Sequence, residues 1–260
     1  MFLAVELEKV LRPDCSACRR AGVLWDIYAA GYDLIVGLVP YQDMLDEVVA
    51  ALDLRPGMRV LDAGCGTGAL AVRLAERHPQ VTLVAVDASS AMLKRARRRR
   101  GASTMEFQQA DINEFLAKHP GAFDRIVSVN LLWALRDPAA TIDLMAASLR
   151  PGGRMVHVTP RWRFRFDRIV LGHLRRTHGL LSFLRALAML PLLALTGLLN
   201  LVLVLQVLVR ERTWQDRSRW QADGLVRLFF RPDLTSFALY PTYAQQGFLI
   251  TCVRRQTSKP

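Results

Sequence analysis

Three glycines at alternate positions could bring a nucleotide-like cofactor close to the backbone. The segment Val60–Gly68 reads VLDAGCGTG, so a short apolar strand reaches Asp62 and then meets Gly64, Gly66 and Gly68. Apolar residues follow at helical spacing, which predicts a strand–turn–helix unit. Glycines in such a turn admit a close ligand, and the N-terminus of the helix offers free N–H groups. The segment therefore predicts a cofactor site.

Polar side chains also end the next predicted strands. Asp87 lies 19 residues beyond Gly68, where a carboxylate can accept hydrogen bonds from the hydroxyls of a ribose. Asp111 ends the third predicted strand and is placed to accept from the exocyclic amino group of an adenine. Asn130 ends the fourth. Ligands of open α/β sheets bind at the carboxyl ends of the strands, so we expect these side chains to converge there.

Two cofactor classes fit the glycines alone. Gly64–Ala69 satisfies the pattern G-x-G-x-x-A, which also occurs in nicotinamide-dependent enzymes. Three features favour a different cofactor: Asp62 extends the pattern to D-x-G-x-G-x-G, Asp111 offers an adenine contact, and an L-R-P-G-G turn at Leu149–Gly153 precedes the fifth predicted strand. Together they resemble the class I S-adenosylmethionine-dependent methyltransferases, over about residues 25–160 and the last 40 residues.

The resemblance implies that S-adenosylmethionine is the cofactor and that no metal is needed. In that family the acid and the glycines hold the methionine end of the cofactor, the second acid holds the ribose, and residues after the third strand border the adenine. The cofactor-binding residues implied for this chain are Asp62, Ala63, Gly64, Cys65, Gly66, Gly68, Asp87, Ala88, Met92, Asp111, Ile112 and Asn130.

The acceptor side of the site is less determined, and no catalytic residue is assigned. Methyl transfer is an in-line displacement in which positioning matters most, and a base is needed only if the acceptor must lose a proton. Trp133 stands where many relatives carry a histidine, which argues against a phenol O-methyltransferase that uses that histidine. The D/N-P-P-Y/F pattern of nucleobase amino methyltransferases is absent after Asn130.

Four other aromatic or polar residues remain candidates beside Asn130 on the acceptor side. Tyr28 and Tyr32 resemble the N-terminal "YD" segment of relatives that act on quinones and phospholipids, although packing of an amphipathic helix explains them equally well. His157 has apolar neighbours in the fifth predicted strand, so a core histidine competes with a base. Trp133 completes the set.

Alternating apolar runs and helical patterns predict an α/β fold of the Rossmann-like, doubly wound type. We expect a mostly parallel seven-stranded sheet, with an apolar helical insertion between the fifth strand and the last two. The predicted strands are 59–62, 82–87, 104–109, 124–130, 154–159, 236–240 and 247–254. The chain divides into an N-terminal helical cap (1–50), a cofactor-binding core (51–160), an apolar and basic helical insertion (161–216), and a C-terminal helix with strands (217–260).

The insertion carries 24 consecutive residues without a charge, Ala186–Val209. That length could cross a bilayer, but a single crossing would separate the last strands from the sheet they complete. Pro191, Gly197 and Asn200 favour two short helices, so we expect a monotopic hairpin; a lid or dimer interface is the alternative. Arginines and aromatic residues in 161–212 suit an anionic membrane surface.

Composition bounds the partners and the compartment. The net charge of +12 predicts an anionic partner, either a membrane or nucleic acid. Nucleic acid is disfavoured because the basic run Lys94–Arg100 lacks interleaved aromatics and is typical of a solvated helix face. Cys15 and Cys18 have no second pair, and no secretory signal is visible, which favours the cytoplasmic side of the membrane, in peripheral or monotopic attachment. The oligomeric state stays open.

These observations predict a membrane-associated S-adenosylmethionine-dependent methyltransferase with a small-molecule or lipid acceptor, such as a quinone precursor or a phospholipid amine. A non-catalytic membrane assembly subunit on the same fold is the main alternative, and an RNA methyltransferase is a weaker one. The acceptor atom, carbon, nitrogen or oxygen, does not follow from the fold.

Overall fold

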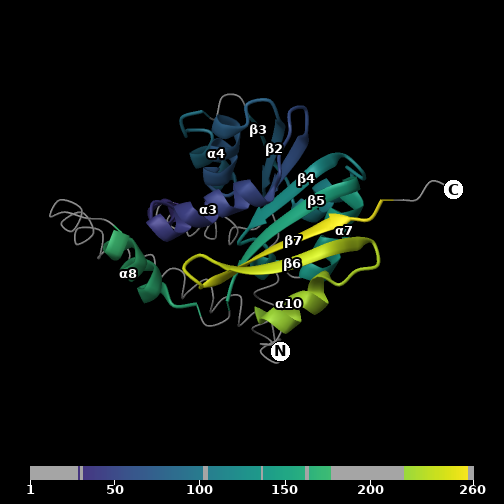
Figure 1. Cartoon of the computed structure of the whole chain (residues 1–260). Coiled ribbons are helices and arrows are strands. Elements are labelled where there is room, and N and C mark those ends of the chain that lie inside the picture. The colour runs from purple at the N-terminus through teal and green to yellow at the C-terminus, as the bar shows by residue number, and fades with distance from the viewer. Residues whose placement is uncertain are drawn as a thin grey trace, which may run out of the picture.

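The computed structural model describes residues 29, 32–101, 105–135, 137–161, 164–176 and 220–256. Its centre is a seven-stranded sheet in the order β3-β2-β1-β4-β5-β7-β6 (Figure 1). This confirms the predicted Rossmann-like sheet. The strands are β1 (Arg59–Ala63), β2 (Thr82–Asp87), β3 (Glu106–Gln109), β4 (Phe123–Val129), β5 (Leu149–Pro160), β6 (Leu234–Thr242) and β7 (Gly247–Arg254).

All pairs among the first five strands are parallel, and β7 runs antiparallel to both of its neighbours. Parallel strands covered on both faces are apolar almost throughout, and the buried centre of β2, Leu83–Val86, fits this rule. Because these strands share one direction, their carboxyl ends lie along a single edge of the sheet. Residues just after Ala63, Asp87, Gln109 and Val129 are therefore brought together.

Helices cover both faces of the sheet, so side chains that alternate along each strand enter two cores. One core holds Val60 and Val127 with the apolar face of α3, and the other holds Leu61 and Ile126 with α7 and α10. The helices are α3 (Val39–Ala51), α4 (Ala69–Arg77), α5 (Ser90–Ala96), α6 (Ile112–Ala117), α7 (Pro138–Ser148), α8 (Phe166–Arg176) and α10 (Ala222–Phe229).

The fifth strand begins earlier than predicted. It starts at Leu149 instead of Arg154 because Leu149 already pairs with Phe123. The next pair joins Arg125 to Arg154, so β5 advances five residues while β4 advances two. The L-R-P-G-G segment is thus an irregularity within β5, and it lies at the opposite end of the sheet from the glycine segment.

Only the start of the predicted insertion is described. There, α8 lies against α3 (Figure 1): Ile169 is buried, and the backbone N–H of Val39 donates to Nδ1 of His173 at 3.2 Å. Arg176 forms an ion pair with Asp43. No helix within the described residues is both long and apolar enough to cross a membrane. Segment 186–209, like Cys15, Cys18 and Tyr28, lies outside those residues.

Candidate functional site

The glycine segment leaves the carboxyl end of β1 as a tight loop fastened to β2. The backbone N–H groups of Gly64 and Cys65 both donate to the carbonyl of Val86, at 2.8 and 3.0 Å. Gly64, Gly66 and Gly68 all have positive φ, at 72°, 54° and 77°. That conformation costs an L side chain about 1–2 kcal/mol, which explains why glycine recurs at every second position. The loop then enters α4 directly after Gly68.

Asp62 is a buried acid beneath this loop. It is 2% exposed, and its Oδ2 atom has no hydrogen-bond partner among the described residues. Burial, and then the charge of Asp87, raise the pKa of the Asp62 carboxyl from 3.8 to about 7. An acid in this state attracts a cation or a hydrogen-bond donor strongly, because its charge is otherwise uncompensated.

Asp87 ties the loop to the start of the next helix. Its Oδ2 accepts from the N–H of Gly66 and its Oδ1 from the N–H of Ser89, both at 2.8 Å. Burial still raises the pKa of Asp87, and these two bonds oppose the shift. Burial raises the pKa of the Cys65 thiol, and the nearby Asp62 and Asp87 add to this shift.

Tyr32 brings the N-terminal segment over the loop. A Cβ atom added at Gly66 would lie 3.9 Å from Cε1 of Tyr32, and Tyr32 also packs against Met92. Its hydroxyl lies 2.7 Å from that of Tyr41. Burial raises the pKa of Tyr32, whereas hydrogen bonds with Tyr41 and Asn130 lower it. The structure therefore gathers Tyr32, Met92 and Asn130 around the glycine loop, as the sequence suggests.

The predicted adenine side is partly occupied with local contacts. Asp111 is exposed at the start of α6, where its Oδ1 accepts from the N–H groups of Asn113 and Glu114, at 2.8 and 3.2 Å. Ile112 is buried beside it. Ala88 follows Asp87, and its carbonyl accepts from the side chain of Gln109 at 3.2 Å. Asp111 can act both as a helix cap and, through its other oxygen, as an acceptor for a ligand.

Of the acceptor-side candidates, Asn130 and Trp133 are at the carboxyl edge. Asn130 has a φ of +56° directly after β4, and Trp133 is half-buried in the short 3-10 helix Leu132–Ala134. The side chain of Leu131 lies beneath the loop, since a Cβ atom on Gly64 would be 2.8 Å from its Cδ1. These residues form the wall next to the glycine loop.

His157 is not at this wall. It is fully buried within β5, its ring centroid is 5.0 Å from that of Phe229 in α10, and neither ring nitrogen has a hydrogen-bond partner among the described residues. Burial lowers the pKa of His157 from 6.5 to about 3, so the imidazole is neutral at ordinary pH and is a very weak base. This placement supports the core interpretation.

Replacing His157 with leucine should therefore leave the protein equally stable or more stable, by about 1–2 kcal/mol, because two unpaired polar atoms leave the core. Between pH 3 and 6.5 the unfolded chain binds a proton at His157 that the folded chain does not, so the contribution of His157 to stability rises with pH across that window. In urea unfolding, the stability of the variant relative to wild type should therefore fall as pH rises from 3 to 6.5. A large loss of stability at pH 8 would show that the imidazole makes an essential contact.

A cationic clamp that sequence reasoning missed holds the loop from outside. Arg99 donates from Nε to the carbonyl of Thr67 and from Nη2 to Thr67 Oγ1 at 3.1 Å, and it pairs with Asp33. Arg95 also pairs with Asp33, at 3.4 Å. The prediction of a solvated helix face for the run Lys94–Arg100 was wrong for these two arginines: Arg95 turns toward Asp33 from the last turn of α5, and Arg99 lies beyond the end of that helix at Ala96. The sequence feature that could have indicated this clamp is Asp33, the acidic residue directly after Tyr32.

Replacing Arg99 with glutamine should loosen the loop more than the fold. We expect about 1 kcal/mol less unfolding free energy, since the ion pair is only half-buried, and a cofactor affinity about fivefold weaker. Arg100→Gln removes the same charge from an exposed position in the same run and serves as the control. Urea unfolding and calorimetric titration measure the two effects; equal losses in both variants would contradict the clamp.

Together these features form a pocket wall suited to a ligand with a positive charge and hydroxyl groups. Asp62 and Asp87 make no ion pair within the described part of the chain, although Asp62 is buried and Asp87 half-buried at the carboxyl edge. An ammonium or sulfonium group would compensate Asp62, and the remaining lone pairs of Asp87 can accept from hydroxyls. Because Gly66 has no side chain and a Cβ atom there would meet only Tyr32, at 3.9 Å, a ligand can approach its backbone closely.

Comparisons with known proteins agree with this geometry. Residues 54–182 match the family model described as "Methyltransferase domain". The Ubiquinone biosynthesis O-methyltransferase of Xanthomonas campestris pv. campestris is 36% identical over 113 residues, which make up 43% of this chain and 46% of the relative. The Trans-aconitate 2-methyltransferase of Deinococcus radiodurans is 36% identical over 117 residues, or 44% and 42% of the two chains. The match thus spans less than half the length of these relatives.

The fold has counterparts among solved structures. One chain of the complex that contains the Haloferax volcanii Trm112 methyltransferase activator superposes with a TM-score of 0.60, over 89% of this chain and 98% of that one. The sequence identity is 16%, so this likeness concerns the fold.

Proposed function

Because the chain carries a methyltransferase domain of the class I S-adenosylmethionine-dependent family, we propose that it transfers a methyl group from this cofactor to a hydrophobic acceptor. The buried, uncompensated Asp62 under a glycine loop is the observation that carries the cofactor assignment. Bound in the site, the cofactor supplies an activated methyl group on a sulfonium.

The residues of the chain have separate tasks in this proposal. Asp62 holds the positively charged methionine end, Asp87 accepts from the ribose, and Met92 with Ile112 borders the adenine. Gly66 allows the close approach, and the clamp of Arg99 keeps the loop in place. These contacts orient the methyl donor, which is the main requirement of an in-line transfer.

The acceptor must approach beside Asn130, Trp133 and Tyr32. None of these is a strong base, and His157 is too weak and too deeply placed to act as one. The proposed acceptor is therefore one that reaches its nucleophilic form without a protein base, such as an acidic phenol or an amine that is partly neutral in solution. The aromatic side chains suit a flat or apolar acceptor.

Two observations favour a lipid-soluble acceptor within that class. The uncharged run Ala186–Val209 offers more apolar surface than a small polar acceptor needs, and one relative is named for ubiquinone biosynthesis. We propose that the chain works at a membrane surface and takes a quinone precursor or a phospholipid amine. The relative named for trans-aconitate makes a small carboxylic acid the competing acceptor.

The test is to incubate the purified full chain with deuterated methyl donor and, separately, with lipid and aqueous extracts of cells. We expect the mass label in a lipid-soluble product, with wild type and not with Asp62→Asn. Label confined to aqueous carboxylic acids would overturn the lipid acceptor while keeping the methyltransferase. Absence of label from both extracts, with cofactor binding intact, would favour a non-catalytic binding role.

A further inference from the structure

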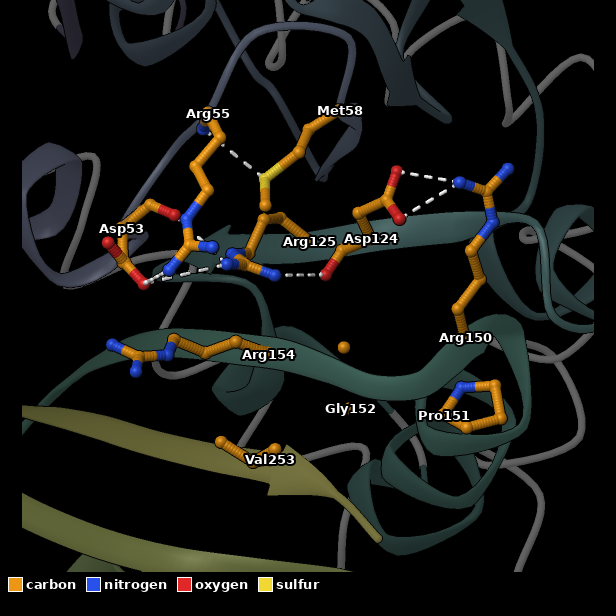
Figure 2. A pocket seen from close by; sticks show the side chains of 11 residues that line it. Asp53, Arg55, Met58, Asp124, Arg125, Arg150, Pro151, Gly152, Arg154 and Val253 are labelled. Carbon is orange, nitrogen blue, oxygen red and sulfur yellow. Dashed lines mark hydrogen bonds and ion pairs between the residues drawn. The ribbon is translucent and has the colours of Figure 1, made fainter. Parts of the chain in front are cut away.

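A second, strongly charged cavity lies at the other edge of the sheet. It has a volume of about 360 Å³ and is bordered by the segment before β1, the starts of β4 and β5, and the end of β7 (Figure 2). The glycine loop follows the carboxyl end of β1, so the two sites are separated by the length of that strand, about 16 Å. This cavity is therefore distinct from the proposed cofactor site.

Positive charge exceeds negative charge in its lining. The charged side chains are four arginines and two aspartates, a formal surplus of two: Arg55, Arg125, Arg150, Arg154, Asp53 and Asp124. Few apolar side chains contribute, and residues 152 and 153 are glycines, so part of the wall is bare backbone. An apolar ligand would find little to contact here, whereas an anion would.

Two of the arginines are committed to the fold. Arg125 is 7% exposed and donates to the carbonyls of Asp53 and Asp124, both at 2.9 Å, and to that of Leu52. Arg150 donates to both carboxylate oxygens of Asp124 at 2.9 Å. Figure 2 shows this pair on one side of the cavity. Asp124 is thereby neutralised and does not compensate the remaining cations.

The other two arginines keep most of their donors available. Arg154 gives Nη1 to the carbonyl of Ala51 at 2.9 Å, and no carboxylate in the described part of the chain forms an ion pair with it. Arg55 is 73% exposed and approaches Asp53 only to 3.9 Å. Burial is the largest cause that lowers the pKa of Arg125; the charges of Arg154 and Arg55 lower this pKa further, and those of Asp53 and Asp124 oppose the shift. A bound anion would relieve this repulsion.

We propose that this cavity binds a phosphate group, held by Arg154 and Arg55 above the buried Arg125. Guanidinium forks match phosphate oxygens in bidentate geometry, and Arg154 and Arg55 border the cavity with donors that the fold leaves available. The volume suits a mono- or diphosphate group. The phosphate can belong to a soluble compound or to the headgroup of an anionic lipid, and both offer the same chemistry.

Calorimetric titration with sodium pyrophosphate at low salt tests the site without any methyl transfer. We expect one binding site with a Kd below about 1 mM, about tenfold weaker in Arg154→Gln and about threefold weaker in Arg55→Gln. Arg227→Gln, an exposed arginine on α10, removes the same charge elsewhere and should bind as wild type. Because Arg154 also holds the backbone of Ala51, thermal unfolding of each variant establishes that it is folded.

Failure of wild type to bind pyrophosphate, or equal affinity in all three variants, would overturn the proposal. Flotation with phosphatidylcholine vesicles that contain phosphatidic acid separates the two sources of phosphate. Vesicle binding that needs Arg154 and Arg55, and is displaced by pyrophosphate, assigns the site to a lipid headgroup. Vesicle binding that is unchanged in both variants, beside pyrophosphate binding that is lost, assigns it to a soluble phosphate.

Discussion

Replacing Asp62 with asparagine should weaken the affinity for S-adenosylmethionine about 100-fold and, above pH 7, stabilise the cofactor-free protein. The loss of affinity follows from removing a buried acceptor for a cationic ligand, worth about 3 kcal/mol. The gain in stability follows because the carboxylate is buried without compensation. Few substitutions combine opposite effects of this size, so the pair of results is diagnostic.

The pH dependence of unfolding shows whether the charge of Asp62 stabilises or destabilises the fold. The pKa of Asp62 is about 7 in the folded chain, against 3.8 for the free group, so between these values the folded protein binds the extra proton. The contribution of Asp62 to stability should therefore fall as pH rises from 4 to 7, by a total on the order of 4 kcal/mol, so the stability of Asp62→Asn relative to wild type should rise by that amount over this range. Cofactor affinity should rise with pH up to about 7 in wild type alone.

Asp87→Asn is the matched control for this result. Both oxygens of Asp87 accept backbone N–H groups, from Gly66 and Ser89, and the NH₂ group of asparagine cannot accept one of them, so Asp87→Asn should lower the stability. Urea unfolding from pH 4 to pH 8 measures all three proteins. An Asp62→Asn variant that is less stable than wild type at pH 8 would mean that the carboxylate has a partner that compensates it.

Alanine substitutions at two glycines of the loop should have different effects, one mainly on stability and the other mainly on cofactor binding. A Cβ atom on Gly68 would lie 2.8 Å from Cβ of Ala96, and its φ is +77°. Gly68→Ala should therefore cost about 2–5 kcal/mol of unfolding free energy. At Gly66 the nearest atom would be 3.9 Å away, so Gly66→Ala should cost only about 1 kcal/mol of backbone strain yet weaken cofactor binding at least about tenfold.

Gly121→Ala is the control that separates the cost of backbone strain from the loss of cofactor binding. Gly121 has a φ of +60° and open space around it, so alanine there carries the same backbone cost away from the loop. It should resemble Gly66→Ala in chemical unfolding and wild type in calorimetric titration with the cofactor. If Gly66→Ala binds as tightly as Gly121→Ala, the ligand does not approach the loop at that point.

Much of the framework follows from local sequence. The predicted bounds of β2 and β7, at 82–87 and 247–254, agree with the structure, because apolar runs between turn residues define them. The early start of β5 was missed, since the pairing of Leu149 with Phe123 depends on a neighbouring strand and not on any local pattern. The glycines of the L-R-P-G-G segment predict a plain turn, and the local sequence does not indicate that the segment is an irregular part of β5.

The residues of the candidate site also divide into those that local sequence predicts and those that only the fold brings together. Residues attached to strand ends, from Asp62 and the glycines to Asp87, come together because parallel topology dictates it. The clamp of Arg99 joins Asp33, 66 positions away, and a charge run gives no hint of which arginine turns inward. The charged cavity before β1 is likewise lined by arginines that lie far apart in the sequence, so it can be recognised only in the folded chain.

Equilibrium binding of S-adenosylmethionine and of NAD⁺ to the full chain at pH 8 tests the central claim most directly. The glycine pattern alone fits either cofactor, whereas the buried Asp62, with Asp87 nearby, favours S-adenosylmethionine because this cofactor carries a sulfonium and an ammonium group. We predict a single site for S-adenosylmethionine, weakened by Asp62→Asn, and no measurable binding of NAD⁺. Binding of NAD⁺ at the loop, or failure to bind S-adenosylmethionine, would contradict the account.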